Sequence, residues 1–133
     1  MQNDQQLRKP SFKKRTILLV DDEQLVVDAG KHVLERLGYT VYTAINGLDA
    51  IDVVKKMKVK LDLVILDMNM PDVSGREVFD TIKTLDQRIK VPLSSGESAN
   101  GDASRMLENG CNGFIQKPFS ILELSEKIKK IMG

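Results

Sequence analysis

The chain has 133 residues, of which 41% are hydrophobic and 29% charged, and its formal net charge is +1. This length suits one domain with a core of its own, and no apolar run approaches the roughly 20 residues that a membrane-spanning helix needs. The first residues lack the apolar centre of a secretory leader. The single cysteine, Cys111, excludes an internal disulfide and fits a reducing compartment, so we expect a cytoplasmic protein.

Charge is unevenly distributed along the chain. Residues 1–15 contain five of the 20 basic side chains but only one of the 19 acidic ones. A basic segment of this kind can bind nucleic acid or anionic lipid, but a solvated arm or linker is the commoner outcome. We therefore interpret residues 1–15 as a basic N-terminal arm or linker and 16–133 as the folded domain, and we do not expect nucleic-acid or membrane binding.

From residue 16 onward, short apolar runs alternate with segments whose apolar residues recur at helical spacing. The apolar runs predict five strands, over 16–20, 39–44, 61–66, 89–95 and 113–116. The other segments predict five helices, over about 25–37, 47–58, 75–85, 102–109 and 121–131. Alternating strands and helices imply a parallel sheet that is covered by helices on both faces.

Capping signals stand before three of the predicted helices. Asn46 can cap the second helix with its side chain. Ser74 and Glu77 have capping-box spacing before the third helix, and Ser120 and Glu123 have it before the last.

The fourth predicted strand is interrupted by Pro92. Proline has no N–H for the ladder and is normally confined to edge strands and bulges. The following segment, 94–101, is rich in Ser, Gly and Asn, which also allows a loop there.

Polar side chains stand at the ends of four of the five strands. They are Asp21 and Asp22 after the first, Asp67 after the third, Ser94 and Ser95 at the fourth, and Lys117 after the fifth. In a doubly wound sheet of order 2-1-3-4-5, the first and third strands are neighbours, so the three carboxylates would meet in one crevice. Adjacent carboxylates repel unless a cation shares the site, and oxygen ligands with room for water suit Mg²⁺ better than Zn²⁺.

These groups together suit phosphoryl chemistry. Mg²⁺ and Lys117 can neutralise phosphoryl oxygens, Ser95 can donate a hydrogen bond to one, and Asp67 can be the nucleophile. Alone, an Asp-Asp pair is often a helix cap and a Lys-Pro pair a loop. Their occurrence at successive strand ends, in this order, is far more specific.

The sequence resembles the receiver domain of bacterial two-component response regulators. The resemblance spans 16–132 and is strongest in 17–23, 63–75, 95–96 and 113–119. Segments 89–96 and 108–113 are similar to receivers fused to hybrid histidine kinases. The resemblance implies a flavodoxin-like, doubly wound five-stranded parallel sheet of order 2-1-3-4-5 with five helices.

It also implies the roles of individual residues. Asp67 matches the aspartate that accepts a phosphoryl group from a phosphohistidine of a sensor histidine kinase or phosphotransfer protein. Asp22 and Asp67 match Mg²⁺ ligands, Asp21 usually acts through a water, and Asn69 contributes its backbone carbonyl.

Three further positions match the family's switch machinery. Ser95 matches the switch hydroxyl, Lys117 the phosphate-pairing lysine, and Phe114 the aromatic side chain whose rotamer reports phosphorylation. The Lys117–Pro118 bond is typically cis in this family. The output would be a downstream protein or a second copy, bound through the last two helices and the fifth strand.

Several alternatives stay open from the sequence. Ser94 could replace Ser95 as the switch hydroxyl, and Phe114 could be an ordinary core aromatic. We expect no output domain after the last helix, so we expect either a stand-alone receiver or a fragment of a longer protein. In both cases we expect the chain to catalyse only its own phosphorylation and dephosphorylation, and not otherwise to be an enzyme.

Two rival functions fit the sequence less well. A receiver-like binding module that is never phosphorylated would lose an acidic or lysine position, and none is lost here. A phosphatase of the haloacid dehalogenase type would need a second aspartate two residues after the nucleophile, where this chain has Asn69.

Overall fold

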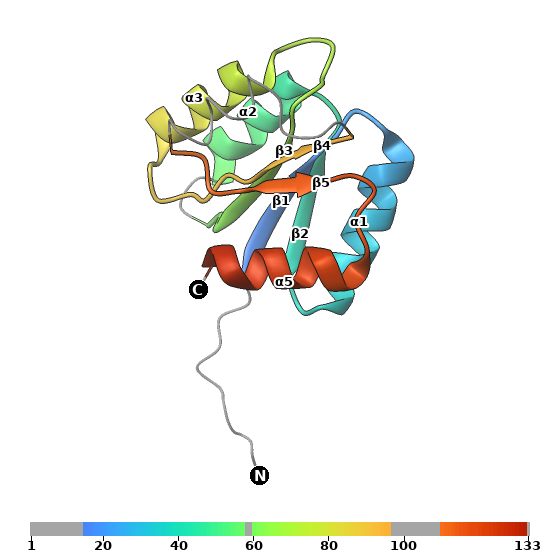
Figure 1. Cartoon of the computed structure of the whole chain (residues 1–133). Helices are drawn as coiled ribbons and strands as arrows, with labels where there is room; N and C mark the ends of the chain where they lie inside the picture. Colours follow the sequence, from blue (N-terminus) through green and yellow to red (C-terminus); the bar gives the residue numbers. More distant parts are fainter. Residues whose placement is uncertain (1–14, 58–59, 97–109, 133) are drawn as a thin grey trace.

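The computed structural model describes residues 15–57, 60–96 and 110–132. They form one five-stranded parallel sheet in the order β2-β1-β3-β4-β5 (Figure 1). The strands are β1 (Thr16–Val20), β2 (Thr40–Ala44), β3 (Leu63–Asp67), β4 (Leu93–Ser95) and β5 (Phe114–Gln116). The predicted doubly wound sheet and its strand order are therefore confirmed.

Four helices lie within the described residues, where the sequence predicted five for the whole chain. They are α1 (Gln24–Arg36), α2 (Gly47–Met57), α3 (Gly75–Leu85) and α5 (Ile121–Met132). The predicted helix at 102–109 lies outside the described residues, as does the arm up to residue 14. None of the four helices is long and apolar enough to cross a membrane.

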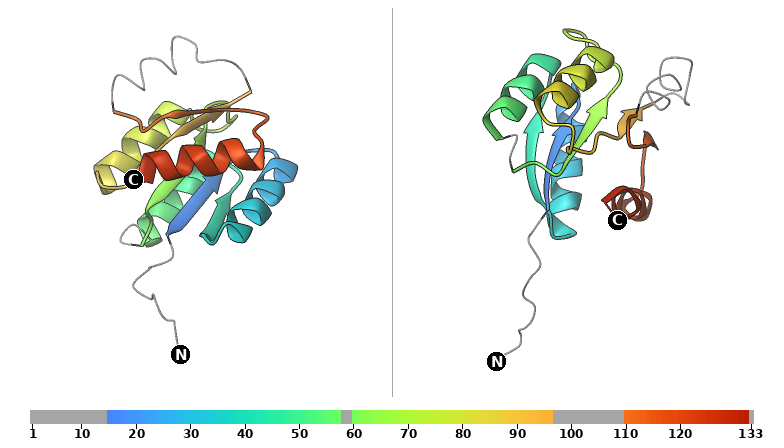
Figure 2. Two further views of the ribbon diagram at one scale, coloured as in Figure 1. Left: turned by 60° about the horizontal axis from the view of Figure 1, so that its bottom comes forward. Right: turned by 90° about the vertical axis from the view of Figure 1, so that its left-hand side faces the viewer.

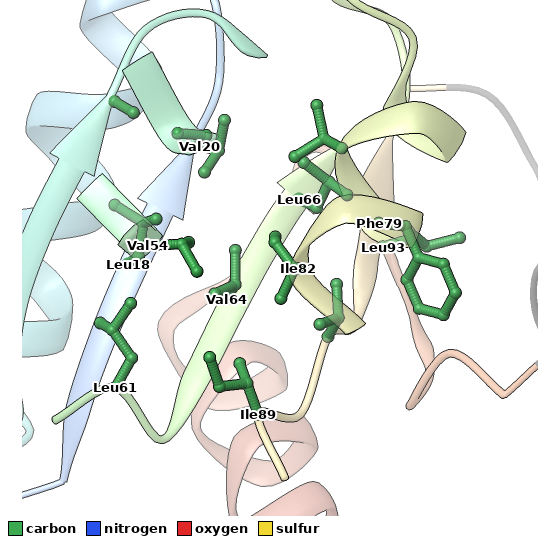
Figure 3. Close-up of a cluster of buried hydrophobic side chains, with 14 of the residues drawn as sticks. Leu18, Val20, Val54, Leu61, Val64, Leu66, Phe79, Ile82, Ile89 and Leu93 are labelled. Carbon is green, nitrogen blue, oxygen red and sulfur yellow. The ribbon is translucent and has the colours of Figure 1, made fainter. Parts of the chain in front are cut away.

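The sheet separates two hydrophobic cores. Helices α2 and α3 cover one face and α1 and α5 the other (Figure 2). Alternate residues of a strand point to opposite faces. Leu18 and Val20 therefore belong to the first core, on the α2 and α3 face, while Ile17 and Leu19 belong to the second core, on the α1 and α5 face. Figure 3 shows the first core, where β1 and β3 pack against α2 and α3. All five residues of β3 are buried, as a central parallel strand requires.

Strand β4 is much shorter than predicted. The sequence predicted 89–95, but only Leu93–Ser95 is a strand, and Lys90 forms an isolated bridge with Leu63. Pro92 is the physical reason, since it has no N–H to donate to β3. Its carbonyl still accepts from the Leu66 N–H at 3.0 Å, so the backbone stays beside β3.

Side chains supplement the incomplete backbone pairing before β4. The Val91 N–H donates to Asn112 Oδ1 at 2.7 Å, and the Asn112 N–H donates to the Val91 carbonyl at 3.1 Å. Lys83 Nζ, from α3, donates to the Ile89 carbonyl at 2.7 Å. Segment 89–91 is therefore held by two side chains in addition to the backbone hydrogen bonds between Lys90 and the β3 region.

The other elements follow the sequence closely. The bounds of β2, β3 and β5 differ from prediction by one or two residues. The capping box of α5 is complete, with the Glu123 N–H donating to Ser120 Oγ and the Ser120 N–H to Glu123 Oε1, both at 3.1 Å. Ser74 also caps α3 as predicted, by accepting from the Glu77 N–H at 3.1 Å.

Candidate functional site

Three carboxylates meet at the carboxyl ends of β1 and β3. Asp21 directly follows β1, and Asp67 is the last residue of β3, its neighbour in the sheet. Carboxylate oxygens of Asp21, Asp22 and Asp67 lie within 4.8 Å of one another. Asp21 and Asp67 are buried, each 1% exposed, whereas Asp22 is exposed. The strand order therefore assembles the cluster that the sequence predicted.

Lys117, which directly follows the edge strand β5, completes the cluster. Its Nζ lies 2.8 Å from Asp21 Oδ2 and 3.6 Å from Asp67 Oδ1. The following Lys117–Pro118 peptide bond is cis, as the family resemblance implied. Burial lowers the pKa of Lys117, but the hydrogen bond to Asp21 and the charge of Asp67 outweigh it, so the pKa is raised. Lys117 is thus a firmly charged ammonium.

The electrostatics of Asp67 show a site that is short of positive charge. Burial, followed by the nearby charge of Asp21, raises the pKa of Asp67 from 3.8 to about 6, against the opposing effects of the Asn69 N–H and Lys117. That N–H donates to Asp67 Oδ1 at 3.2 Å. One lysine does not balance three carboxylates, and an all-oxygen donor set of this size fits a hard divalent cation.

Strands β4 and β5 bring the remaining polar groups close. Asn69 Nδ2 donates to Ser95 Oγ at 3.3 Å, and the Lys117 N–H donates to the Ser95 carbonyl at 2.8 Å. Ser94 is paired with Asp67 across β3 and β4, and the hydroxyl that accepts from Asn69 belongs to the next residue, Ser95. Ser95 therefore remains hydrogen-bonded to Asn69 although Pro92 interrupts the ladder before β4.

Phe114 is partly buried and packs against the core on the α2 and α3 face. It is paired with Leu93 in the β4–β5 ladder. This position agrees with either interpretation of Phe114, as a core aromatic or as a mobile reporter on β5.

The cluster opens into a groove of about 920 Å³ between α1 and α5. Asp22, Asp67, Asn69 and Lys117 line its polar end. Apolar side chains line the rest, among them Leu25 and Val26 of α1, and Phe119, Ile121 and Leu124 at the start of α5. The buried Asp67 and the exposed Asp22 therefore stand at the polar end of a groove whose walls are mostly apolar.

Two side chains near the site were missed by the sequence analysis. Gln116 Nε2 donates to the carbonyls of Gly96 at 3.0 Å and Lys117 at 3.2 Å, across the ends of β4 and β5. Asp72 accepts from two amides of α2, which lie 24 and 25 residues earlier in the chain. No local pattern signals either contact, because both depend on the tertiary fold.

An acidic cluster on β1 and β3, a lysine after β5 and a hydroxyl at the end of β4 define a receiver-type site on a doubly wound sheet. A model of the family described as the response regulator receiver domain matches residues 17–129. The chain belongs to this family, which confirms the resemblance found in the sequence.

Individual relatives agree with this assignment. The polar-differentiation response regulator DivK of Brucella anthropi is 30% identical over 121 residues, which cover 90% of this chain and 97% of DivK. The sensor kinase CckA of Brucella abortus is 30% identical over 117 residues, 88% of this chain but only 12% of the kinase. This chain is thus similar both to a separate regulator and to a segment of a sensor kinase.

A solved structure extends the comparison to the fold. The response regulator TrrA of Thermotoga maritima, determined in complex with Mg²⁺ and beryllium fluoride, is 36% identical. Its TM-score is 0.75, with 88% of this chain and 98% of TrrA covered. Both the fold and the family are therefore supported over nearly the whole described domain.

Proposed function

We propose that this chain is a phosphorylation-activated signalling switch whose acceptor is Asp67. A carboxylate oxygen of Asp67 attacks the phosphorus of a phosphohistidine on a sensor histidine kinase or phosphotransfer protein. The O–P bond forms as the P–N bond breaks, and the electron pair of that bond leaves with the imidazole. The chain then catalyses only its own phosphorylation and dephosphorylation.

The observation that carries this proposal is the surroundings of Asp67. Its carboxylate lies within 4.8 Å of those of Asp21 and Asp22, and its Oδ1 lies 3.6 Å from Lys117 Nζ. Asp21, Asp22, Asp67 and the Asn69 carbonyl would hold Mg²⁺. Bound Mg²⁺ supplies positive charge that neutralises the phosphoryl oxygens and keeps Asp67 ionised as a nucleophile.

Lys117 and Ser95 act on the phosphoryl group once it is attached. Lys117 Nζ, at 3.6 Å from Asp67 Oδ1, is near enough to pair with a phosphoryl oxygen there. The Ser95 hydroxyl is linked to the same site through Asn69 and can donate to another oxygen. A phosphoryl group brings a charge of about −1.5 to −2, so both groups are drawn toward Asp67.

This movement would change the surface around β4 and β5. Both responding groups lie at the ends of these short strands, and Phe114 starts β5. We propose that the altered face, with α5, binds a downstream protein or a second copy of the chain. We place the protein in the cytoplasm, where sensor kinases present their phosphohistidines, and we propose no role for nucleic acid.

Intact-mass spectrometry after incubation with acetyl phosphate and Mg²⁺ tests the proposal. The parent chain should gain one phosphoryl group, and the gain should be lost with a chelator and in Asp67→Asn. Asp80→Asn is the matched control, since Asp80 is an exposed carboxylate on α3 that should not affect the gain. A parent that binds Mg²⁺ but gains no mass would contradict phosphoryl acceptance and leave a receiver fold that serves only binding.

A further inference from the structure

Asp72 joins the loop after β3 to the start of α2. The Gly47 N–H donates to Asp72 Oδ1 at 3.0 Å, and the Leu48 N–H donates to Asp72 Oδ2 at 3.1 Å. Each carboxylate oxygen of Asp72 therefore accepts a hydrogen bond from one of two successive backbone amides. The hydrogen bond from Gly47 is the main reason that the pKa of Asp72 is lowered, which keeps the carboxylate charged.

These contacts complete the cap of α2. The first amides of a helix have no partner within the helix, and each needs an acceptor from elsewhere. Asn46 supplies two, because its Oδ1 accepts from the Asp49 N–H at 2.8 Å and its carbonyl accepts from the Ala50 N–H at 3.1 Å. Only the amides of Gly47 and Leu48 depend on the loop after β3.

The loop and the helix also touch closely at this point. A Cβ at Gly47 would lie 2.8 Å from Val73 Cβ and 3.0 Å from a methyl group of Val78. Since such distances are too short for carbon atoms, only glycine lets α2 approach the loop this closely. The Asp72 contact is therefore part of a tight interface between α2 and residues 68–74.

The same loop carries Asn69, three residues before Asp72. Asn69 donates from its N–H to Asp67 and from its side chain to Ser95. At the far end of the loop, a Cβ at Gly75 would lie 3.2 Å from the Asp67 carbonyl oxygen. The loop is thus fixed at both ends, and Asp72 fastens its middle to a separate helix.

We propose that Asp72 is a positioning residue, which holds the loop after β3 against α2 and so keeps Asn69 in place beside Asp67 and Ser95. The consequence for phosphorylation depends on the function proposed above. The positional effect on Asn69 does not, so the two can be tested separately.

The test compares Asp72→Ala and Asp72→Asn with Asn46→Ala in the full chain. Asn46→Ala is the matched control, since it also removes a side-chain cap of α2 but touches no residue of the loop. The readouts are amide hydrogen exchange at Asn69 and the Mg²⁺ concentration that half-saturates the NMR shifts of the site. Urea unfolding gives the loss of stability in each variant.

Asp72→Ala should speed exchange at Asn69 and raise the half-saturating Mg²⁺ concentration about 10-fold, the lower end of what loss of an outer-shell partner costs a metal site. Asp72→Asn, which keeps one acceptor oxygen, should lie between Asp72→Ala and the parent. Asn46→Ala should match the parent in both readouts while unfolding at lower urea.

Equal exchange at Asn69 in Asp72→Ala and the parent would overturn the proposal, as would an equal effect of Asn46→Ala. Asp72→Asn decides the matter if the alanine variant does not fold. Failure of the parent to accept a phosphoryl group would count against the proposed function alone, because exchange at Asn69 needs no phosphorylation.

Discussion

The two halves of the sheet differ in how much backbone pairing holds them. In the half formed by β2, β1 and β3, ladders of five and four residue pairs join neighbouring strands. Beyond β3 the ladders have only two and three pairs, and Figure 1 shows β4 and β5 as the short strands of the sheet. Side chains of Lys83, Asn112 and Gln116 supplement the pairing there.

This difference matches the division of work at the site. Asp21 directly follows β1 in the half with long ladders, and Asp67 ends β3, the strand where the two halves meet, whereas Ser95 and Lys117 stand at the ends of the short ladders. Local opening is easiest where few backbone hydrogen bonds and contacts must break. The proposed acceptor therefore stands on the strand that borders both halves, and the groups that would respond to a phosphoryl group lie on the short-ladder half, which is easier to shift.

The largest effect is expected at the end of β3, where the two halves meet, from Asp67→Asn. With the pKa of Asp67 raised from 3.8 to about 6, the unfolded chain loses this proton more readily than the native one between these pH values. The parent therefore loses stability as the pH rises from about 4 to about 6. Without Mg²⁺, the asparagine variant should exceed the parent at pH 7 by up to about 3 kcal/mol, since each pKa unit corresponds to roughly 1.4 kcal/mol.

Urea unfolding of both proteins with a chelator, at pH 3.5, 5 and 7, measures this gain. It should shrink at pH 5 and nearly vanish at pH 3.5, where the parent's Asp67 is mostly protonated in both states. A gain of the same size at all three pH values would show that the charge of Asp67 is not its cause.

A smaller effect is expected on the short-ladder half, from Asn112→Ala. The Val91 N–H then loses its acceptor at the point where Pro92 has already interrupted the ladder. Loss of such a partner costs about 1–2 kcal/mol. Urea unfolding should show this loss, and hydrogen exchange should show that the amides of β4 open faster while those of β1 do not.

Asn112→Asp and Ser120→Ala are the controls for this prediction. The aspartate keeps an acceptor oxygen and should restore most of the protection of β4. Ser120→Ala removes a cap of α5 at a cost of about 1 kcal/mol, without contacting β4. Faster exchange throughout the sheet in Asn112→Ala would mean that the two halves open as one unit.

The sequence predicted the half with long ladders, formed by β2, β1 and β3, better than the short-ladder half formed by β4 and β5. Continuous apolar runs such as 63–66 identify buried parallel strands without tertiary information, and the strand order then brings Asp21 and Asp67 together. Local capping signals such as Ser120 and Glu123 were also reliable, because both partners lie within one turn.

The extent of β4 could not be predicted in the same way. Pro92 indicated an interruption, but the side chains that support this segment come from elsewhere in the chain. Asn112 lies 21 residues from Val91, and Lys83 lies 6 residues from Ile89. Whether such side chains meet depends on how α3 and β5 pack against β4. The Asp72 contact with α2 was missed for the same reason.

Hydrogen exchange with mass spectrometry, on the parent and Asp67→Asn with Mg²⁺, before and after acetyl phosphate, tests most directly whether a phosphoryl group on Asp67 acts on the short-ladder half. In the parent, exchange should change in peptides that cover 93–96 and 114–118 and stay constant in those that cover 16–20 and 63–66. Asp67→Asn should show no change. An unchanged parent, or the same change in both proteins, would contradict the switch.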